Sequence, residues 1–156
     1  MLIRVVAVGT KMPGWVQQAV DDYSRRLPPE IGLEWREVRA EQRSGAGTAA
    51  TWMQREAQRI RAALPPSAHL VVLDERGSDL ATRDFAARLQ RWQRAGRAVA
   101  IVIGGPDGLD PELKDGAQER LRLSSLTLPH ALVRVLLAEQ LFRAWSLNSG
   151  HPYHRD

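Results

Sequence analysis

The stretch AVAIVIGGPDGL, residues 98–109, contains the clearest strand of the chain and a glycine-rich turn directly after it. Its first six residues are all apolar, which is typical of a strand that is buried on both faces of a sheet. Gly104 and Gly105 then allow the backbone to approach a ligand closely, and Gly108 permits a positive φ angle. A tight strand-to-helix turn that binds nothing remains the alternative for this motif taken by itself.

Strand-like and helical segments alternate on both sides of this stretch. Further strands are expected at residues 2–9, 33–38, 69–74 and 121–128. Helical patterns cover residues 13–28 and 51–64, a short segment near 111–119 and a long segment from about Pro129. A further helix is expected between Thr82, which can cap its start, and Gly96, which lies just past its end. Only the loop around residues 40–48 looks long. The alternation predicts one α/β domain over residues 1–156, with a mostly parallel sheet covered on both faces.

Composition and missing motifs exclude several classes of protein. The chain has no cysteine, so disulfides and thiolate metal sites are excluded, and no secretory signal or membrane-length apolar run is visible. We therefore expect a cytoplasmic protein. Neither a P-loop nor a G-x-G-x-x-G motif is present, which argues against a nucleoside triphosphatase and a dinucleotide-dependent oxidoreductase. No pair of residues has metal-ligand spacing, and no metal is expected.

The positive charge of the chain is concentrated near its C-terminus. The formal net charge is +4, and residues 120–156 account for +3 of it, with five arginines against Glu139 and Asp156. Such a balance suggests an anionic partner, for example a nucleic acid. The same region ends in HPYHRD, residues 151–156, which is either a solvated tail or part of a site.

The final helical segment is apolar around nearly its whole circumference. A helix of this kind must be buried on more than one side. The sheet provides one side, and a second copy of the same helix would provide the other in a two-fold dimer. A loop covering the outer face is the alternative. His130 and Arg134 share one polar stripe, and Glu139 and Arg143 form an i, i+4 pair on another. The helix dipole should disfavour protonation of His130.

Three motifs, taken together, resemble the RlmH family of small SPOUT-class methyltransferases. They are VAVGTKMPGWV at residues 6–16, VIGGPDGL at 102–109, and LTLPHALVRVLLAEQLFRAW at 126–145 followed by HPYHR. The resemblance runs over the whole chain and is weakest between about residues 40 and 66. It implies transfer of a methyl group from S-adenosylmethionine to N3 of pseudouridine 1915 in 23S ribosomal RNA. It further implies a homodimer that acts on assembled ribosomes.

The resemblance also implies a fold detail and a set of site residues. The C-terminal segment would thread through a loop to form a trefoil knot, which pattern and composition do not predict. S-adenosylmethionine would lie in this knot. Its contacts, by matched position, would be Leu73, Gly104, Leu123, Ser124, Ser125, Leu126, Thr127 and Leu128.

The chemistry of the tail suggests how it would complete the site. N3 of the base carries a proton that has to leave, and histidine accepts protons near neutral pH. Arginine can stabilise a developing anion or bind phosphate, and tyrosine can stack on a base. We therefore expect Tyr153, His154 and Arg155 to complete the pocket across the dimer interface. His154 is the first choice for the proton acceptor and His130 the second.

Two other functions are kept as alternatives. A non-catalytic RNA- or ribosome-binding factor would use the basic C-terminal quarter and would not bind S-adenosylmethionine. A dinucleotide-dependent oxidoreductase with a degenerate glycine turn would bind a nicotinamide cofactor instead.

Overall fold

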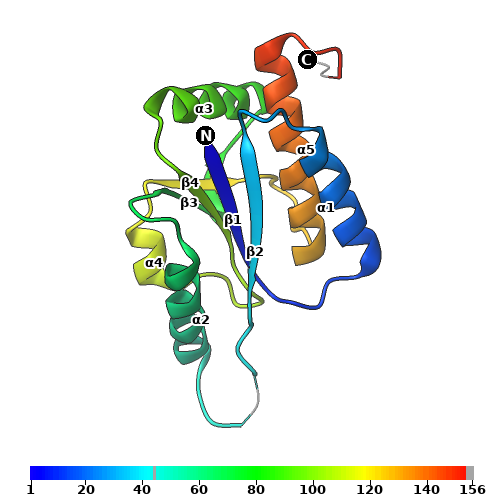
Figure 1. Cartoon of the computed structure of the whole chain (residues 1–156). Coiled ribbons are helices and arrows are strands. Elements are labelled where there is room, and N and C mark those ends of the chain that lie inside the picture. The colour runs from blue at the N-terminus through cyan, green and yellow to red at the C-terminus, as the bar shows by residue number, and fades with distance from the viewer. Residues whose placement is uncertain (44, 154–156) are drawn as a thin grey trace.

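The computed structural model describes residues 1–43 and 45–153, and in them strands alternate with helices (Figure 1). The strands are β1 (Leu2–Val8), β2 (Gly32–Val38), β3 (His69–Asp79), β4 (Val99–Ile103) and β5 (Glu119–Arg122). The helices are α1 (Gly14–Arg26), α2 (Ala49–Ala63), α3 (Thr82–Ala95), α4 (Pro111–Asp115) and α5 (His130–Ser149). The predicted alternation is confirmed.

The strands form one sheet in the order β2-β1-β4-β3-β5, and every neighbouring pair is parallel. β4 lies at the centre of the sheet, and all of its residues are buried. Parallel neighbouring strands have to be joined by crossover connections. The strands of a parallel sheet are apolar on both sides, so both faces of the sheet have to be covered. The predicted α/β class and the buried central strand are both confirmed.

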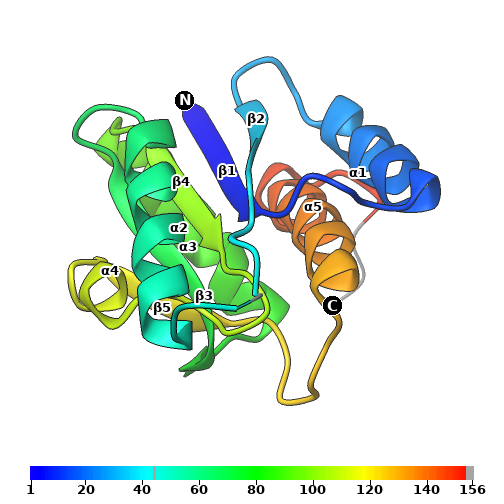
Figure 2. The same ribbon diagram turned by 90° about the horizontal axis from the view of Figure 1, so that it is seen from below.

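Helices cover both faces of this sheet (Figures 1 and 2). α3 and α5 pack on one face and α1 packs against α5, whereas α2 and α4 pack on the other face. Side chains alternate along β1 accordingly: Ile3 and Val5 face α3 and α5, while Val6 and Val8 face α2 and α4. Each fully buried aliphatic side chain of this kind stabilises the fold by roughly 1.5–3 kcal/mol.

Local signals set several helix ends, and one predicted cap is absent. Thr48 caps α2, since its hydroxyl accepts a hydrogen bond from the N–H of Thr51 at 3.3 Å. Gly96 ends α3 in the left-handed conformation with φ of 74°, as predicted. The prediction for Thr82 is wrong. Thr82 is the first residue inside α3, and its hydroxyl donates a hydrogen bond to the Gln140 side chain at 2.9 Å.

The predicted strand at residues 121–128 is wrong beyond its second residue. β5 ends at Arg122, and residues 123–128 form a loop that leads to α5. The apolar alternation suggested a strand, but the Ser124 hydroxyl accepts a hydrogen bond from the N–H of Leu126 at 2.9 Å. Such a local bond competes with a strand ladder. The Leu126 side chain is 74% exposed, so it does not continue the buried face of β5.

β3 is longer than the predicted residues 69–74 and carries a bulge. Leu121 of β5 pairs with Leu73 and again with Ser78, and the register shifts between these two positions. A Cβ atom at Gly77 would lie 2.7 Å from the carbonyl carbon of Leu121. Only glycine lets β3 and β5 approach each other this closely.

α5 keeps apolar side chains on several sides, as predicted from its sequence. Leu137, Leu141 and Ala144 are buried in the core, whereas Leu132 is 37% exposed. The dimer that would cover the outer side and the trefoil knot both stay predictions. Within the described residues no helix is sufficiently long and apolar to span a membrane.

Candidate functional site

The carboxyl ends of β4 and β5, and the middle of β3 at its register shift, bring the residues predicted to bind the methyl donor to one edge of the sheet. Leu73 of β3 pairs with Ile103 of β4 and with Leu121 of β5. Gly104 follows Ile103 directly, and the 123–128 loop begins just after β5. In open parallel sheets, ligands bind beyond this edge. Leu73, Gly104 and the 123–128 loop therefore share the edge at which a ligand is expected.

The glycine turn, residues 104–108, is closely packed by the protein itself. The N–H of Gly108 donates a hydrogen bond to the carbonyl oxygen of Gly105 at 3.0 Å, and Gly108 has the predicted positive φ, at 87°. A Cβ atom at Gly104 would lie 2.8 Å from Leu109 Cγ, and one at Gly105 would lie 3.1 Å from Val8 Cγ1. The contact at Gly104 leaves no room for a side chain and the one at Gly105 is tight, so packing accounts for the two glycines without any ligand and the turn alone does not identify a binding site.

The 123–128 loop offers free polar backbone groups at the same edge. The N–H groups of Ser124, Ser125, Thr127 and Leu128 have no hydrogen-bond acceptor among the described residues. The exposed side chain of Leu126 provides an apolar surface beside them. A ligand that carries carboxylate, hydroxyl and ring-nitrogen acceptors together with an apolar ring system, such as S-adenosylmethionine, fits this donor set.

His130, the first residue of α5, joins that helix to the glycine turn. Its Nε2 accepts hydrogen bonds from Nε and Nη2 of Arg134, at 3.2 and 3.1 Å. Because a guanidinium only donates, the proton of the neutral ring sits on Nδ1, which is left to donate to the main chain of Gly104. Burial, followed by the positive charge of Arg134, lowers the pKa of His130 from its ordinary value. Protonation of the imidazole is thus disfavoured, and its acceptor nitrogen is already occupied.

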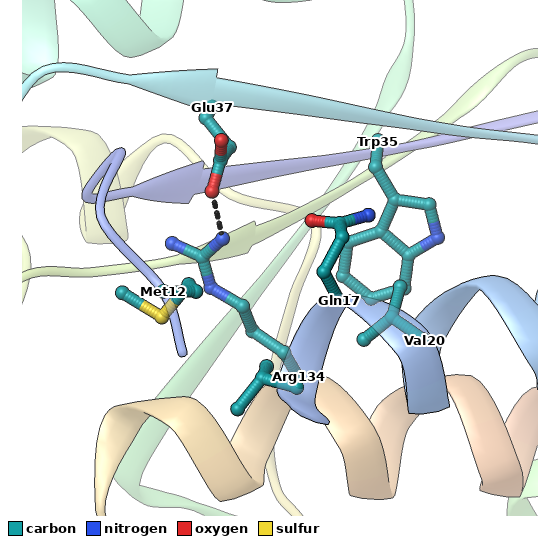
Figure 3. Close-up of a pocket in the computed structure, with 7 residues that line it drawn as sticks. Met12, Gln17, Val20, Trp35, Glu37 and Arg134 are labelled. Carbon is teal, nitrogen blue, oxygen red and sulfur yellow. Dashed lines mark hydrogen bonds and ion pairs between the residues drawn. The ribbon is translucent and has the colours of Figure 1, made fainter. Parts of the chain in front are cut away.

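Arg134 is a buried arginine that connects α5 to β1 and β2. Its side chain is 4% exposed; Nη1 donates to Glu37 at 2.5 Å, and Nη2 donates to the carbonyl oxygen of Gly9 at 2.8 Å. In Figure 3, Arg134 extends from α5 toward Glu37, with Met12 beside its guanidinium group. Sequence analysis missed Glu37, because it lies 97 residues from Arg134 and no local pattern links the two.

A small pocket of about 180 Å³ lies beside this ion pair, between α1, β2 and α5. Its lining residues are Met12, Val16, Gln17, Val20, Trp35, Glu37 and Arg134 (Figure 3). None of the predicted donor-binding residues lines it. The pocket therefore belongs to the packing of α1 against α5 rather than to the sheet edge that carries Gly104.

Tyr153, in the C-terminal tail, packs on the middle of α5. Its hydroxyl donates to Glu139 Oε1 at 3.0 Å, and its ring centre lies 4.6 Å from that of Phe142. Glu139 also accepts from Arg143 at 2.7 Å, which confirms the predicted pair. Burial, followed by hydrogen bonds to Tyr23 and Glu139, raises the pKa of Tyr153.

The structure does not bring Tyr153 together with His130 in one chain. Glu139, which holds the Tyr153 hydroxyl, comes nine residues after His130 on the same helix. At the rise of an α-helix this separation is about 14 Å along the axis. His154 and Arg155, predicted beside Tyr153, lie outside the described residues. Across the described residues no group of three or more histidine, aspartate or glutamate side chains is arranged to hold a metal ion.

The chain is similar to known methyltransferases over nearly its full length. A family model described as "Predicted SPOUT methyltransferase" matches residues 1–154. Proteins named ribosomal RNA large subunit methyltransferase H are 59% identical in Burkholderia thailandensis and 57% in Ralstonia pickettii, each over 155 residues and 99% of both chains. A solved structure of a probable methylase family protein from Haemophilus influenzae has a TM-score of 0.56 at 17% identity. It covers 99% of this chain and 70% of that one, and shows the fold alone.

Proposed function

The chain belongs to the SPOUT methyltransferase family, and from this premise we propose that it methylates ribosomal RNA of the large subunit. The proposed reaction transfers a methyl group from S-adenosylmethionine to N3 of pseudouridine 1915 in 23S rRNA, within the assembled ribosome. The relatives named above are rRNA methyltransferases over the same length, which supports the substrate class. The net charge of +4 gives only modest affinity for free RNA, which favours a substrate that the ribosome presents in a fixed shape.

The methyl donor would be held at the sheet edge by Leu73, Gly104 and the 123–128 loop. The observation that carries this assignment is the set of unpaired N–H groups of Ser124, Ser125, Thr127 and Leu128 at the end of β5, within the described residues. S-adenosylmethionine supplies an electrophilic methyl group on a sulfonium. The protein contributes position, since methyl transfer is an in-line displacement that depends on alignment and local charge.

The proton on N3 would pass to a histidine of the tail. The bond from N3 to the methyl carbon would form as the bond between that carbon and the sulfonium sulfur breaks, and S-adenosylhomocysteine would leave with the electron pair. The N3–H bond would break as well, and His154 is our first choice for the acceptor of that proton. His130 is the second choice. Its Nε2 already accepts hydrogen bonds from Arg134, which makes His130 less suited to take the proton than His154. Tyr153 would contact the base, and Arg155 would stabilise the negative charge that develops on it.

These tail residues would act across a homodimer. Glu139, which holds the Tyr153 hydroxyl, lies about 14 Å along α5 from His130 in the same chain, so a site that needs both the tail and the knot is more simply built from two chains. The partly exposed Leu132 on α5 supports a second copy packed on this helix. Sedimentation at micromolar concentration should give the mass of a dimer, and a stable monomer would refute this part.

The test of the function uses S-adenosylmethionine labelled in its methyl group. The full-length protein is added to assembled ribosomes that lack the modification and, separately, to free 23S rRNA. Label in one hairpin of the large-subunit RNA, from ribosomes only, is the expected result. A variant lacking residues 151–156 should bind the methyl donor in calorimetry with nearly normal affinity and transfer no label. Full activity of this variant would remove the tail from the mechanism.

A further inference from the structure

An ion-pair cluster around the buried Glu56 contacts the glycine turn from the face of the sheet opposite to His130. Arg43, in the segment between β2 and α2, makes a two-pronged contact with Glu56 of α2: Nη1 to Oε2 is 2.5 Å and Nη2 to Oε1 is 3.2 Å. The Nε of the same arginine donates to Asp107 of the glycine turn at 2.9 Å. One guanidinium therefore joins α2 to the turn.

Glu56 lies directly against the turn and is almost fully buried, at 2% exposure. A Cβ atom built on Gly105 would lie 3.2 Å from Glu56 Oε1. The Glu56 carboxylate also accepts the N–H of Glu41 at 2.9 Å. A buried carboxylate is tolerated only when it is paired and hydrogen-bonded. Arg43 and the main chain of Glu41 provide these partners.

Four of the five N–H donors of Arg43 are engaged within the protein. Besides Glu56 and Asp107 it donates to the carbonyl oxygen of Glu41 at 2.6 Å, and its guanidinium lies 5.7 Å from the centre of the Trp52 ring. The hydrogen bond to Glu56 raises the pKa of Arg43, although burial acts against it. The arginine is thus fixed in place before any ligand binds.

The ion pair to Asp107 adds to the packing that holds the glycine turn. Its two adjacent glycines have little conformational preference of their own, and the backbone hydrogen bond within the turn joins Gly108 to Gly105. Asp107 is the side chain of the turn that an ion pair anchors, and its partner Arg43 comes from a different part of the chain. A group that binds ligand with backbone atoms is effective only when those atoms are held in place.

We propose that Arg43 and Glu56 are positioning residues for the methyl donor, which hold the glycine turn through Asp107 in the shape that binds it. This inference rests on the proposed function, in which Gly104 contacts S-adenosylmethionine. Arg43 lies in the part of the chain where the resemblance to the family is weakest. In this proposal Arg43 supports donor binding without touching the donor.

The test compares full-length variants for binding of S-adenosylmethionine by calorimetry and for methyl transfer to ribosomes. Asp107→Asn removes the ion pair to the turn and leaves the Arg43–Glu56 pair intact. Arg43→Gln removes both, and the double variant completes a cycle. Asp115→Asn is the matched control, because it breaks the 2.6 Å pair with Arg120 outside the turn.

Asp107→Asn should raise the Kd and the KM for S-adenosylmethionine about fivefold, with the KM for ribosomes and the melting temperature close to wild type. Adding Asp107→Asn to Arg43→Gln should weaken binding no further, because both changes break the same contact. Asp115→Asn should bind normally. Unchanged donor affinity in both single variants, or fully additive losses in the double variant, would overturn the inference and leave the methyltransferase proposal standing. A wild-type protein that does not bind the donor at all would overturn both.

Discussion

Replacing Arg134 by methionine should destabilise the protein strongly, because this arginine is buried and fully engaged. The substitution keeps an apolar side chain of similar length but removes the donors to Glu37, to the carbonyl oxygen of Gly9 and to His130. Removing one partner of a buried ion pair typically costs about 3–5 kcal/mol. Glu37 is 34% exposed, so water can solvate the carboxylate that is left behind. We therefore expect a loss of about 2–3 kcal/mol in the free energy of unfolding.

The measurement is urea unfolding at one fixed protein concentration, because a dimer would make stability depend on concentration. For a chain of this size the expected loss corresponds to a fall in melting temperature of roughly 5–10 °C. Arg120→Met is the control: Arg120 pairs with Asp115 at 2.6 Å, but the two side chains are 43% and 75% exposed. Exposed pairs contribute about 0–1 kcal/mol.

The reasoning is refuted if Arg134→Met loses no more stability than Arg120→Met at an unchanged urea slope. A changed slope would show that the variant alters the unfolded or native ensemble, and the two free energies would then not be comparable. Glu37→Gln separates charge from hydrogen bonding, since it keeps an oxygen that Arg134 can donate to. It should lose less stability than Arg134→Met.

Three further outcomes follow from the same geometry. The pKa of His130 lies below its ordinary 6.5, so below that pH the unfolded chain takes up a proton that the folded chain refuses; the melting temperature should fall with pH there, and His130→Gln should flatten this slope. Gly105→Ala should lower the free energy of unfolding by about 1–3 kcal/mol through overpacking. A Cβ atom at Gly116 would lie 3.5 Å from its nearest neighbour, so Gly116→Ala should be neutral or slightly stabilising in urea unfolding. The raised pKa of Tyr153 should keep its phenol protonated well above pH 10, in an ultraviolet titration compared with Tyr153→Phe; ionisation of Tyr153 near pH 10 would contradict the contact with Glu139.

Apolar runs predicted the sheet well, because a strand that is buried on both faces needs apolar side chains at every position. The run at residues 99–103 became the central strand β4. The error at residues 121–128 has the opposite cause: an alternating pattern was present, but the serine at 124 bonds locally and Leu126 faces outward. The family resemblance had already linked this segment to the methyl donor, whereas the strand pattern alone suggested further sheet.

The buried charges were the hardest part to predict. Glu56 lies four residues after Trp52 and four before Ile60, on the apolar stripe of α2, and a carboxylate in that position was a visible signal that was missed. The partner of Arg134 could not be predicted, because Glu37 is brought near it by the order of strands. For His130 the predicted direction of the pKa agrees with the structure, but the leading cause is burial rather than the helix dipole.

The central place of β4 has a consequence for the synthesis of this protein. β1 is complete at Val8, but its inner neighbour begins only at Val99, and the two strands pair along their length. At translation rates of about 5–20 residues per second, the inner edge of the largely apolar β1 stays unpaired in the nascent chain for on the order of 5–20 s. Such an open edge pairs readily with other chains. Premature termination anywhere before β4 should therefore yield fragments that aggregate or bind chaperones, and slower translation of residues 40–98 should lower the soluble yield.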